Sequence, residues 1–394
     1  MVIYNSKKCS FVEFIFNNFP VNSEILGSPK GFYLHTLDWI KAYKNNKNFC
    51  ESSYISVHPK HTVVRSRLPK TIDGKIPLEF QDELQHEFPE TFVATIPKGR
   101  AWSDCAVISP DDKLLADVSR VYVPTTEHPI FRKLKLRPST YIDRTVCILP
   151  VLSGDHNYFH WMFEVLPRIH LLEKSGFNIQ EIDHFFLNEC RYSFHHETLA
   201  ALGIPLKKII EHNKISHIKA KQIVLPSLAG DTPSMAPWVC NFLRDKFLNG
   251  TTNKKSLKRI YINRIDAKYR KILNEAQIID FLSKFGFESL TLALMSVAEQ
   301  AEIFSSADVI VAPHGAGLAN IVFCKPETKV VDIFMPEHIN PCYWFLSNCM
   351  SLDYYCIFGE KLHESQTEEC HTFKKNFEIN IKNLSKILEI AGVH

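Results

Sequence analysis

The sequence of 394 residues lacks several patterns that commonly identify a class of protein. It contains no run of about 20 apolar residues, the length that a membrane-spanning helix needs. Its 11 cysteines are scattered, with no C-x-x-C pair and no zinc-site spacing, which favours reduced thiols over a disulfide framework or a structural metal. The formal net charge is only +3 and the basic clusters are short, so no nucleic-acid partner is expected.

Two ligand-binding patterns are also missing. No G-x-G-x-x-G turn is followed by an acid about 20 residues later, which argues against a nicotinamide-dependent oxidoreductase. No Asp-x-Asp triplet is present either, so the paired carboxylates that commonly hold a divalent cation and a nucleotide are absent. A diphosphate on this chain would be stabilised by Arg and Lys side chains, backbone N–H groups and a helix dipole, so no metal or other cofactor is expected.

The first part of the sequence, residues 1–90, contains no motif that indicates a chemistry and is interpreted as an N-terminal extension of unclear role. It includes a short apolar patch, 11–16, which Glu13 interrupts. No signal peptide is expected from this pattern. The patch is interpreted as part of a hydrophobic core. The alternative is a segment that binds peripherally to a membrane surface.

Two domains are expected after this extension, because 394 residues exceed what one hydrophobic core usually organises. Residues 91–250 begin with short strands and a hairpin around 109–113. Residues 256–394 alternate apolar strands with helices, the pattern of a parallel, doubly wound α/β sheet. The polar, turn-rich segment 249–255 is predicted to link the two domains. The expected strands include 144–152, 184–187, 222–225, 259–262, 309–312 and 329–334.

The most informative stretch is a buried-strand pattern at 309–312 that runs into His314-Gly315-Ala316-Gly317 and a predicted helix start at Leu318. In an α/β sheet, ligands bind at the carboxyl ends of strands, where helix N-termini point free N–H groups outward. Glycines allow a bulky anion to approach the backbone closely. The loop is therefore predicted to hold a phosphate, and the alternative is an ordinary strand-to-helix turn.

A second candidate site lies on an apolar helix predicted at 157–174. His160, Glu164 and Arg168 stand four residues apart, which places them in one column on a regular helix. Pro167 lacks an N–H and is expected to kink the helix near the Phe163 carbonyl. If the column faces a cleft, His160 or Glu164 is a candidate general base, with Arg168 holding an anion or orienting Glu164. The alternative is an ion-pair stripe that faces solvent.

His156 and His160 also stand four residues apart, the spacing of two metal ligands on a helix. The sequence offers no third ligand for them, so a metal site is not expected.

Basic residues follow the strand predicted at 259–262. If the strands predicted at 259–262 and 309–312 belong to one parallel sheet, Arg264 and Arg270 would lie at the same edge of that sheet as the 314–317 loop. Guanidinium groups match phosphate oxygens bidentately. Glu275 is interpreted either as an acceptor for ribose hydroxyls or as an acid in the first turn of a helix.

Three segments, 157–168, 263–275 and 313–320, occur together in an order that resembles glycosyltransferase family 61. The similarity covers roughly residues 92–360. This resemblance implies two facing Rossmann-like domains of the GT-B type with an interdomain cleft, an inverting mechanism and a UDP-sugar donor. The run Asn263-Arg264-Ile265-Asp266 departs from the family's more usual Ser/Thr-Arg-Arg/Lys, which puts the second basic contact there in doubt.

The leading hypothesis is an inverting glycosyltransferase that moves a sugar from a UDP-sugar, of the UDP-GlcNAc or UDP-xylose class, to a glycan hydroxyl in surface polysaccharide synthesis. Residues 91–250 would form the acceptor side and 256–394 the nucleotide-sugar side. The candidate bases are Glu164, His160 and, third, Asp155. The candidate substrate-binding residues are Arg168, Arg264, Arg270, Glu275, His314, Gly315, Ala316, Gly317 and Asn320.

The competing hypothesis is a catalytically inactive protein that binds a sugar nucleotide or serves in assembly. Such a protein would keep the phosphate loop and lose only the base. Secretory members of the family normally carry an N-terminal membrane anchor, and the absence of that pattern favours the bacterial-type branch. The expected location is therefore the cytoplasm. Within it, the protein could associate peripherally with the inner face of the membrane.

Overall fold

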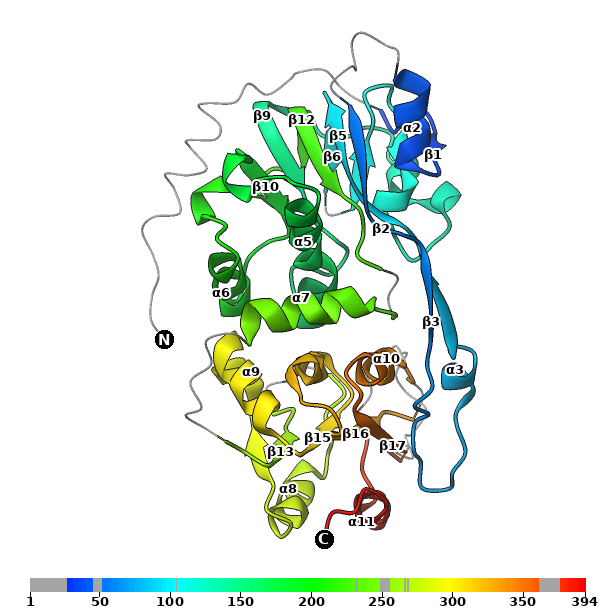
Figure 1. Ribbon diagram of the computed structural model, residues 1–394, viewed down its shortest axis with the longest axis vertical. Helices are drawn as coiled ribbons and strands as arrows, with labels where there is room; N and C mark the ends of the chain where they lie inside the picture. The colour runs from blue at the N-terminus through cyan, green and yellow to red at the C-terminus, as the bar shows by residue number, and fades with distance from the viewer. Residues whose placement is uncertain are drawn as a thin grey trace. The chain divides into compact units, whose positions relative to one another are not determined.

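The chain forms two compact units, which are described here separately. The N-terminal unit comprises residues 1–60 and 89–229, and the C-terminal unit comprises 61–88 and 230–394 (Figure 1). The computed structural model describes residues 27–44, 52–103, 105–230, 233–248, 256–265, 267, 269–336, 338–360 and 376–394. The apolar patch at 11–16 and the predicted linker 249–255 lie outside these residues.

The N-terminal unit is built on a mixed ten-stranded sheet in the order β1-β8-β7-β6-β12-β9-β10-β11, with β5 pairing β12 and β2. Strands β12, β9, β10 and β11 are parallel to one another. Strands β5 and β6 run antiparallel to β12, so the parallel α/β pattern covers only part of this sheet. The strands are β1 Phe32–Tyr33, β2 Ser53–His58, β5 Thr91–Pro97, β6 Arg100–Trp102, β7 Ala106–Ile108, β8 Leu114–Leu115, β9 Thr140–Ile148, β10 His184–Leu187, β11 Ile209–Glu211 and β12 His217–Pro226.

The predicted hairpin is confirmed, because β7 and β8 pair antiparallel through Ile108 and Leu114. The predicted strand at 144–152 was placed too late in the sequence. Strand β9 ends at Ile148, and Pro150, which has no N–H to donate to a ladder, lies in the loop beyond it. The helices of this unit are α2 Thr36–Tyr43, α4 Tyr158–His160, α5 Pro167–Lys174 and α6 Ser193–Ala201.

The helix predicted at 157–174 contains a wide turn. Residues Trp161–Val165 form a π-helix between α4 and α5. Because Pro167 cannot donate to the Phe163 carbonyl, the backbone adjusts, and the Leu166 N–H donates to the Trp161 carbonyl five residues earlier at 3.0 Å. The extra residue in this turn rotates α5 relative to α4. The expected single column of His160, Glu164 and Arg168 is therefore wrong beyond Glu164.

The C-terminal unit contains a parallel five-stranded sheet in the order β14-β13-β15-β16-β17. The strands predicted at 259–262, 309–312 and 329–334 are confirmed as β13, β15 and β16. Helices cover both faces of this sheet, with α8 and α11 on one side (Figure 1). The elements are β13 Arg259–Ile262, β14 Glu288–Leu290, β15 Val309–Pro313, β16 Lys329–Phe334, β17 Asp353–Phe358, α7 Pro237–Phe247, α8 Glu275–Ser283, α9 Val297–Ser306, α10 Cys342–Cys349 and α11 Ile381–Ile390.

The strand order of this sheet contains a topological switch. The chain passes from β13 outward to β14 and then returns past β13 to form β15 on its other side. The loops that leave β13 and β15 therefore diverge at the carboxyl edge of the sheet. Open α/β sheets bind their ligands at such a point.

Residues 61–88 reach the C-terminal unit from the early part of the sequence. They form the antiparallel pair β3 His61–Val64 and β4 Gln85–Phe88, with the short helix α3 Leu78–Gln81 between them. Phe80 is fully buried, with its ring 5.4 Å from Trp344 and 6.1 Å from Phe334. Residues 1–90 are therefore divided between the two units.

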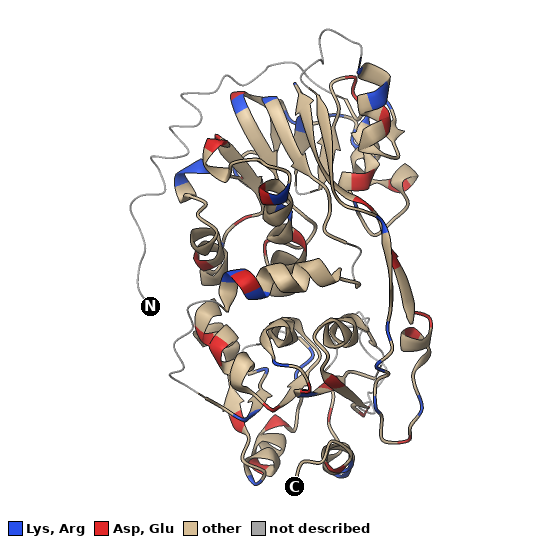
Figure 2. Ribbon diagram, in the orientation of Figure 1, with Lys and Arg blue, Asp and Glu red and all other residues tan. Residues whose placement is uncertain are grey.

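Lysine and arginine are interspersed with aspartate and glutamate along the described parts of both units (Figure 2). No helix in the described part of the chain is long and apolar enough to cross a membrane.

Candidate functional site

The first candidate site lies at the carboxyl ends of β13, β15 and β16. We call it the switch-point site, and it comprises Arg264, Arg270, His314–Gly317, Asp332 and His338. Its strands are adjacent and parallel, so the side chains that follow them share one edge of the sheet. The structure thus brings together residues up to 74 positions apart in the sequence, from Arg264 to His338.

Arg264 is held directly against the loop after β15. Its guanidinium donates to the His314 carbonyl at 3.4 Å and to the Tyr269 carbonyl at 3.0 Å. Its backbone N–H donates to Glu275 Oε1 at 2.9 Å, and the Tyr261 hydroxyl donates to the same oxygen at 2.9 Å. Glu275 opens α8 and fixes the loop after β13, so the structure supports the first-turn interpretation of this acid.

Gly315 is required for this close approach. Its backbone is extended, with φ 173°, a conformation that any residue can adopt. A Cβ at this position would instead collide with Nη1 of Arg264. The collision involves the end of a flexible side chain, so the guanidinium would be displaced and the fold retained.

If the loop holds UDP, as expected from the sequence, the variant Gly315→Ala should weaken UDP binding about tenfold, because the displaced guanidinium loses roughly one charge-assisted hydrogen bond. Its melting temperature should stay within about 2 °C of the wild type, since the change strains no backbone. Titration calorimetry and a thermal melt measure the two quantities. Unchanged UDP affinity would show that the position of Arg264 beside this glycine is unimportant for binding.

Arg270 adopts a left-handed backbone conformation with φ 56°, which is uncommon outside glycine and is typical of functional sites. Burial lowers the pKa of its guanidinium, while the anionic forms of Tyr343, Asp332 and Cys342 act in the opposite direction. Arg270 therefore lies close enough to the Asp332 carboxylate for that charge to affect its pKa.

His314 is held on three sides. Its Nδ1 lies 2.9 Å from Asp332 Oδ2, and its ring stacks on Phe334 at 4.6 Å and packs against Tyr343 at 5.0 Å. The His338 ring lies 6.2 Å away, and burial lowers the pKa of His338 to about 4, with the charges of His314 and Arg270 adding to this effect. His338 is therefore neutral near pH 7, and the permanent positive charges of the site are the guanidinium groups of Arg264 and Arg270.

The 314–317 loop continues into a 3₁₀ helix, Ala316–Phe323, in place of the expected start of an α-helix. The first N–H groups of such a helix have no acceptor within it and are available to a ligand. Asn320 has a different role from the expected substrate contact. It is fully buried, and its amide donates to Gln300 Oε1 at 2.7 Å and to the Gly317 carbonyl at 3.2 Å, so it shapes the loop from beneath.

The second candidate site is in the N-terminal unit and centres on Glu164. His160 Nδ1 lies 3.0 Å from Glu164 Oε2. Burial lowers the pKa of Arg120, and the Glu164 carboxylate opposes that shift; burial also raises the pKa of Tyr122, and Glu164 raises it further. Arg120 and Tyr122 are thus close enough for Glu164 to affect their charge. Sequence reasoning missed both, because they lie in an irregular loop with no motif around them.

Arg168 does not take part in this second site. It is 1% exposed, and its Nε donates to the carbonyls of Pro226 and Ser227 at 3.1 and 3.2 Å, while Nη1 donates to the Pro150 carbonyl at 3.3 Å. Burial lowers its pKa to about 10. The π-helix turn directs this side chain away from Glu164, and the expected anion contact is replaced by a structural role.

Replacing Arg168 with alanine is accordingly expected to destabilise the protein by roughly 3 kcal/mol or more, because it leaves three buried carbonyl groups without their donor. The variant Arg168→Lys keeps the charge but not the planar guanidinium. Its free energy of unfolding should lie between those of the wild type and Arg168→Ala. Chemical denaturation measures both. A loss of UDP affinity or turnover without a loss of stability would return Arg168 to the ligand-binding residues.

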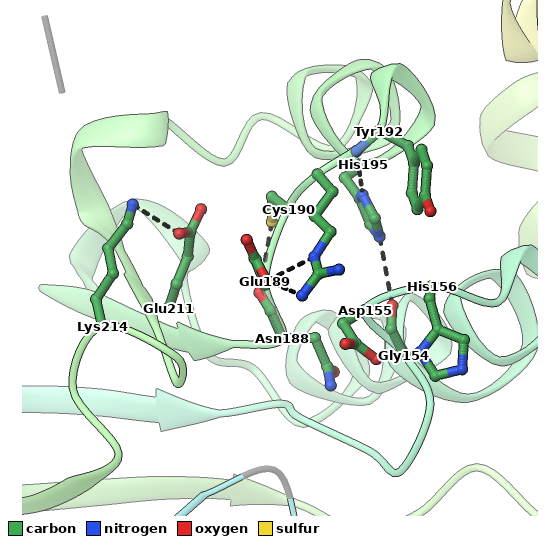
Figure 3. A network of polar contacts seen from close by, with 11 residues as sticks. Gly154, Asp155, His156, Asn188, Glu189, Cys190, Tyr192, His195, Glu211 and Lys214 are labelled. Carbon is green, nitrogen blue, oxygen red and sulfur yellow. Dashed lines mark hydrogen bonds and ion pairs between the residues drawn. The ribbon is translucent and has the colours of Figure 1, made fainter.

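Asp155 and His156 lie in the loop after β9, beside the loops that follow β10 and β11 (Figure 3). Asp155 Oδ1 lies 2.6 Å from His156 Nδ1. Burial would raise the pKa of Asp155, but the hydrogen bond and charge of His156 together hold it below its usual value. The neighbouring loop is fixed by His195, whose Nε2 lies 3.3 Å from the Gly154 carbonyl.

His156 and His160 therefore each have a carboxylate partner of their own. Among the residues that the structure describes, no group of three or more His, Cys, Asp or Glu side chains is arranged to hold a metal ion.

Comparisons with known proteins agree on one family. Residues 158–331 match the family described as Glycosyltransferase 61. Beta-1,2-xylosyltransferase RCN11 of Oryza sativa subsp. japonica is 28% identical over 134 residues, which cover 30% of this chain and 25% of that protein. Beta-1,2-xylosyltransferase of Arabidopsis thaliana is 29% identical over 122 residues, covering 28% of this chain and 22% of that protein.

The chain thus spans about a quarter or less of the length of these two relatives. The matched region contains Glu164, His160, Arg264, Arg270 and the 314–317 loop, whereas Asp332 and His338 of the switch-point site lie just beyond it. These matches show that residues 158–331 are similar to glycosyltransferase family 61, and that parts of the chain are similar to two plant β-1,2-xylosyltransferases.

Proposed function

We propose that the protein is an inverting glycosyltransferase of the GT-B type. It would transfer a sugar from a UDP-sugar, of the UDP-GlcNAc or UDP-xylose class, to a hydroxyl group of a glycan acceptor in surface polysaccharide synthesis. The observation that carries this proposal is the meeting of Arg264 and the His314–Gly317 loop at the switch point of the C-terminal sheet. The names of the two xylosyltransferase relatives support the reaction class.

The C-terminal unit would bind the donor. Two guanidinium groups, the His314 ring and the first N–H groups of the 3₁₀ helix gather at one sheet edge. This combination suits the two phosphates of a nucleoside diphosphate, because guanidinium forks bind phosphate oxygens bidentately. The same groups would neutralise the charge that grows on the leaving diphosphate as the bond to the anomeric carbon breaks.

The N-terminal unit would supply the base that removes the proton from the acceptor hydroxyl. That oxygen then attacks the anomeric carbon on the face opposite UDP, which inverts its configuration. A general base works best when its pKa is near the working pH. The lowered pKa of Asp155 makes it a weaker base, so we favour the Glu164–His160 pair over Asp155.

We further propose that no divalent cation is needed, since the guanidinium groups of Arg264 and Arg270 provide positive charge at the switch-point site. A thermal-shift panel with UDP, GDP, CMP and NADH, with and without EDTA, tests the ligand and the cation together. A rise in melting temperature that is selective for UDP and survives EDTA is expected, because a ligand that binds only the folded state stabilises it. A rise with NADH, or a response that EDTA abolishes, would contradict the proposal.

Transfer itself is tested by incubating the protein with UDP-GlcNAc and UDP-xylose and measuring UDP release with and without glycan acceptors. UDP binding without hydrolysis or transfer would favour the inactive sugar-nucleotide-binding protein over the enzyme.

A further inference from the structure

Asp332, in β16, is the most deeply buried carboxylate of the switch-point site, with no exposed surface. Its strand neighbours in register are Ala312 on β15 and Cys356 on β17, neither of which compensates a charge. Burying a carboxylate in such surroundings is costly unless it is paired and hydrogen-bonded. The position therefore calls for an explanation beyond packing.

Both strong contacts of this carboxylate converge on one oxygen. His314 Nδ1 lies 2.9 Å from Oδ2, and the Tyr354 hydroxyl donates to the same Oδ2 at 2.7 Å. The other oxygen, Oδ1, is buried without a hydrogen-bond partner in the described part of the chain. Tyr354 thus fixes the carboxylate in the orientation that faces the histidine.

The hydrogen bond assigns a role to each nitrogen of the ring. Asp332 can only accept at Oδ2 while ionised, so the Nδ1 proton of His314 is directed to it. Among the described residues the structure gives Nε2 of His314 no protein partner. With Nδ1–H directed to Asp332, a second proton on Nε2 would let the ring donate to an anion.

Other titratable and charged groups face this pair from every element around it. The charge of Arg270 responds to Asp332, and Arg264 donates to the His314 carbonyl. Anionic forms of Cys342 and Tyr343 on α10 are disfavoured, because burial and the Asp332 charge raise the pKa of both. The remaining groups are Tyr354 and Cys356 on β17 and the neutral His338. Asp332 is thus the anion that compensates His314.

We propose that Asp332 is a positioning residue, which orients His314 and keeps its ring protonated so that Nε2–H donates to the donor diphosphate. Tyr354 supports this role by fixing the Asp332 carboxylate. This inference rests on the proposed function, because the anion it invokes is the diphosphate of the nucleotide sugar. The consequence is that UDP affinity falls as the pH rises and His314 loses its proton.

The experiment measures UDP affinity by titration calorimetry between pH 5.5 and pH 9 for the wild type, Asp332→Asn and Tyr354→Phe. Asp332→Asn removes the charge that favours the protonated ring, so the fall in affinity should move to lower pH, with at least a tenfold loss at pH 8 and a smaller one at pH 5.5. Tyr354→Phe removes a hydrogen bond that disperses the carboxylate charge, so its fall should move to higher pH. Opposite displacements distinguish positioning from structural damage, which would lower affinity in both variants at every pH.

A matched control is His314→Gln, which should bind UDP weakly and lack this pH-dependent fall. A parallel affinity loss at all pH values in Asp332→Asn, or an unchanged pH dependence in His314→Gln, would overturn the proposal.

A second readout is independent of the enzyme's function. In the protein without nucleotide, ¹⁵N NMR of the imidazole should show a proton on Nδ1 of His314 that is lost or displaced in Asp332→Asn. If this signature is found and UDP does not bind, the proposed function fails while the arrangement of Asp332 and His314 stands. If UDP binds and the signature is absent, the positioning role fails while the proposed function stands.

Discussion

Replacing Arg264 with alanine is expected to abolish sugar transfer and to weaken UDP binding about a hundredfold. The guanidinium donates to the His314 carbonyl, where the 314–317 loop begins. Two charge-assisted hydrogen bonds from this group to a donor phosphate would contribute roughly 3 kcal/mol. The variant Arg264→Lys should retain the charge and lose the planar guanidinium. Its UDP affinity should therefore lie between those of the wild type and Arg264→Ala. Titration with UDP and a transfer assay measure these effects.

The matched control for this variant is Lys271→Ala, which removes an exposed cation from the same loop. It should change UDP affinity less than twofold, because an exposed charge is screened by solvent and salt. The Arg264→Ala melting temperature without ligand should remain close to that of the wild type. Activity within a few-fold of the wild type in Arg264→Ala would mean that the donor phosphates bind elsewhere.

The second large effect is expected at Glu164. Glu164→Gln keeps the shape of the side chain and removes its ability to accept a proton, so kcat should fall by about 10³ while UDP affinity stays unchanged. Steady-state kinetics across pH, with UDP binding measured in parallel, separates these quantities.

Two further variants sharpen this result. Glu173→Gln, at an exposed position on α5, serves as the control and should behave as the wild type. Asp155→Asn tests the third candidate base and should retain most of the turnover. If Asp155→Asn is inactive and Glu164→Gln is not, the base lies in the loop after β9, and the Glu164–His160 pair is structural.

Three strands of the C-terminal sheet, β13, β15 and β16, were predictable because they are short apolar runs, rich in Val and Ile, that end in loops; β14 and β17 were not predicted. A parallel sheet brings the ends of such strands to one edge whatever their separation in the sequence. The proximity of Arg264 and His314 follows from this rule and needs no knowledge of the long segment between them. The order of strands, which creates the switch point, was not available from the periodicity.

The errors in the helix predicted at 157–174 have a single cause. Counting four residues from His160 to Glu164 to Arg168 assumes a regular helix, and Pro167 breaks that assumption. The kink was predicted, but its consequence for the direction of Arg168 was not. Asn320 illustrates another limit, because an amide in a glycine-rich loop has the same sequence signature whether it faces a ligand or, as here, Gln300 beneath the loop.

The path of residues 61–88 has a consequence for how the protein can be made. Lys70 contacts Tyr355, 285 positions later in the sequence, and Phe80 fills a space beside Trp344. During synthesis this early segment lacks its partners until the residues around 344–355 have left the ribosome. This delay favours slow folding and leaves apolar side chains exposed in the meantime. The donor-binding half is consequently not a contiguous stretch of sequence: a fragment that starts at residue 230 would carry every residue of the switch-point site and still lack part of the unit that supports it.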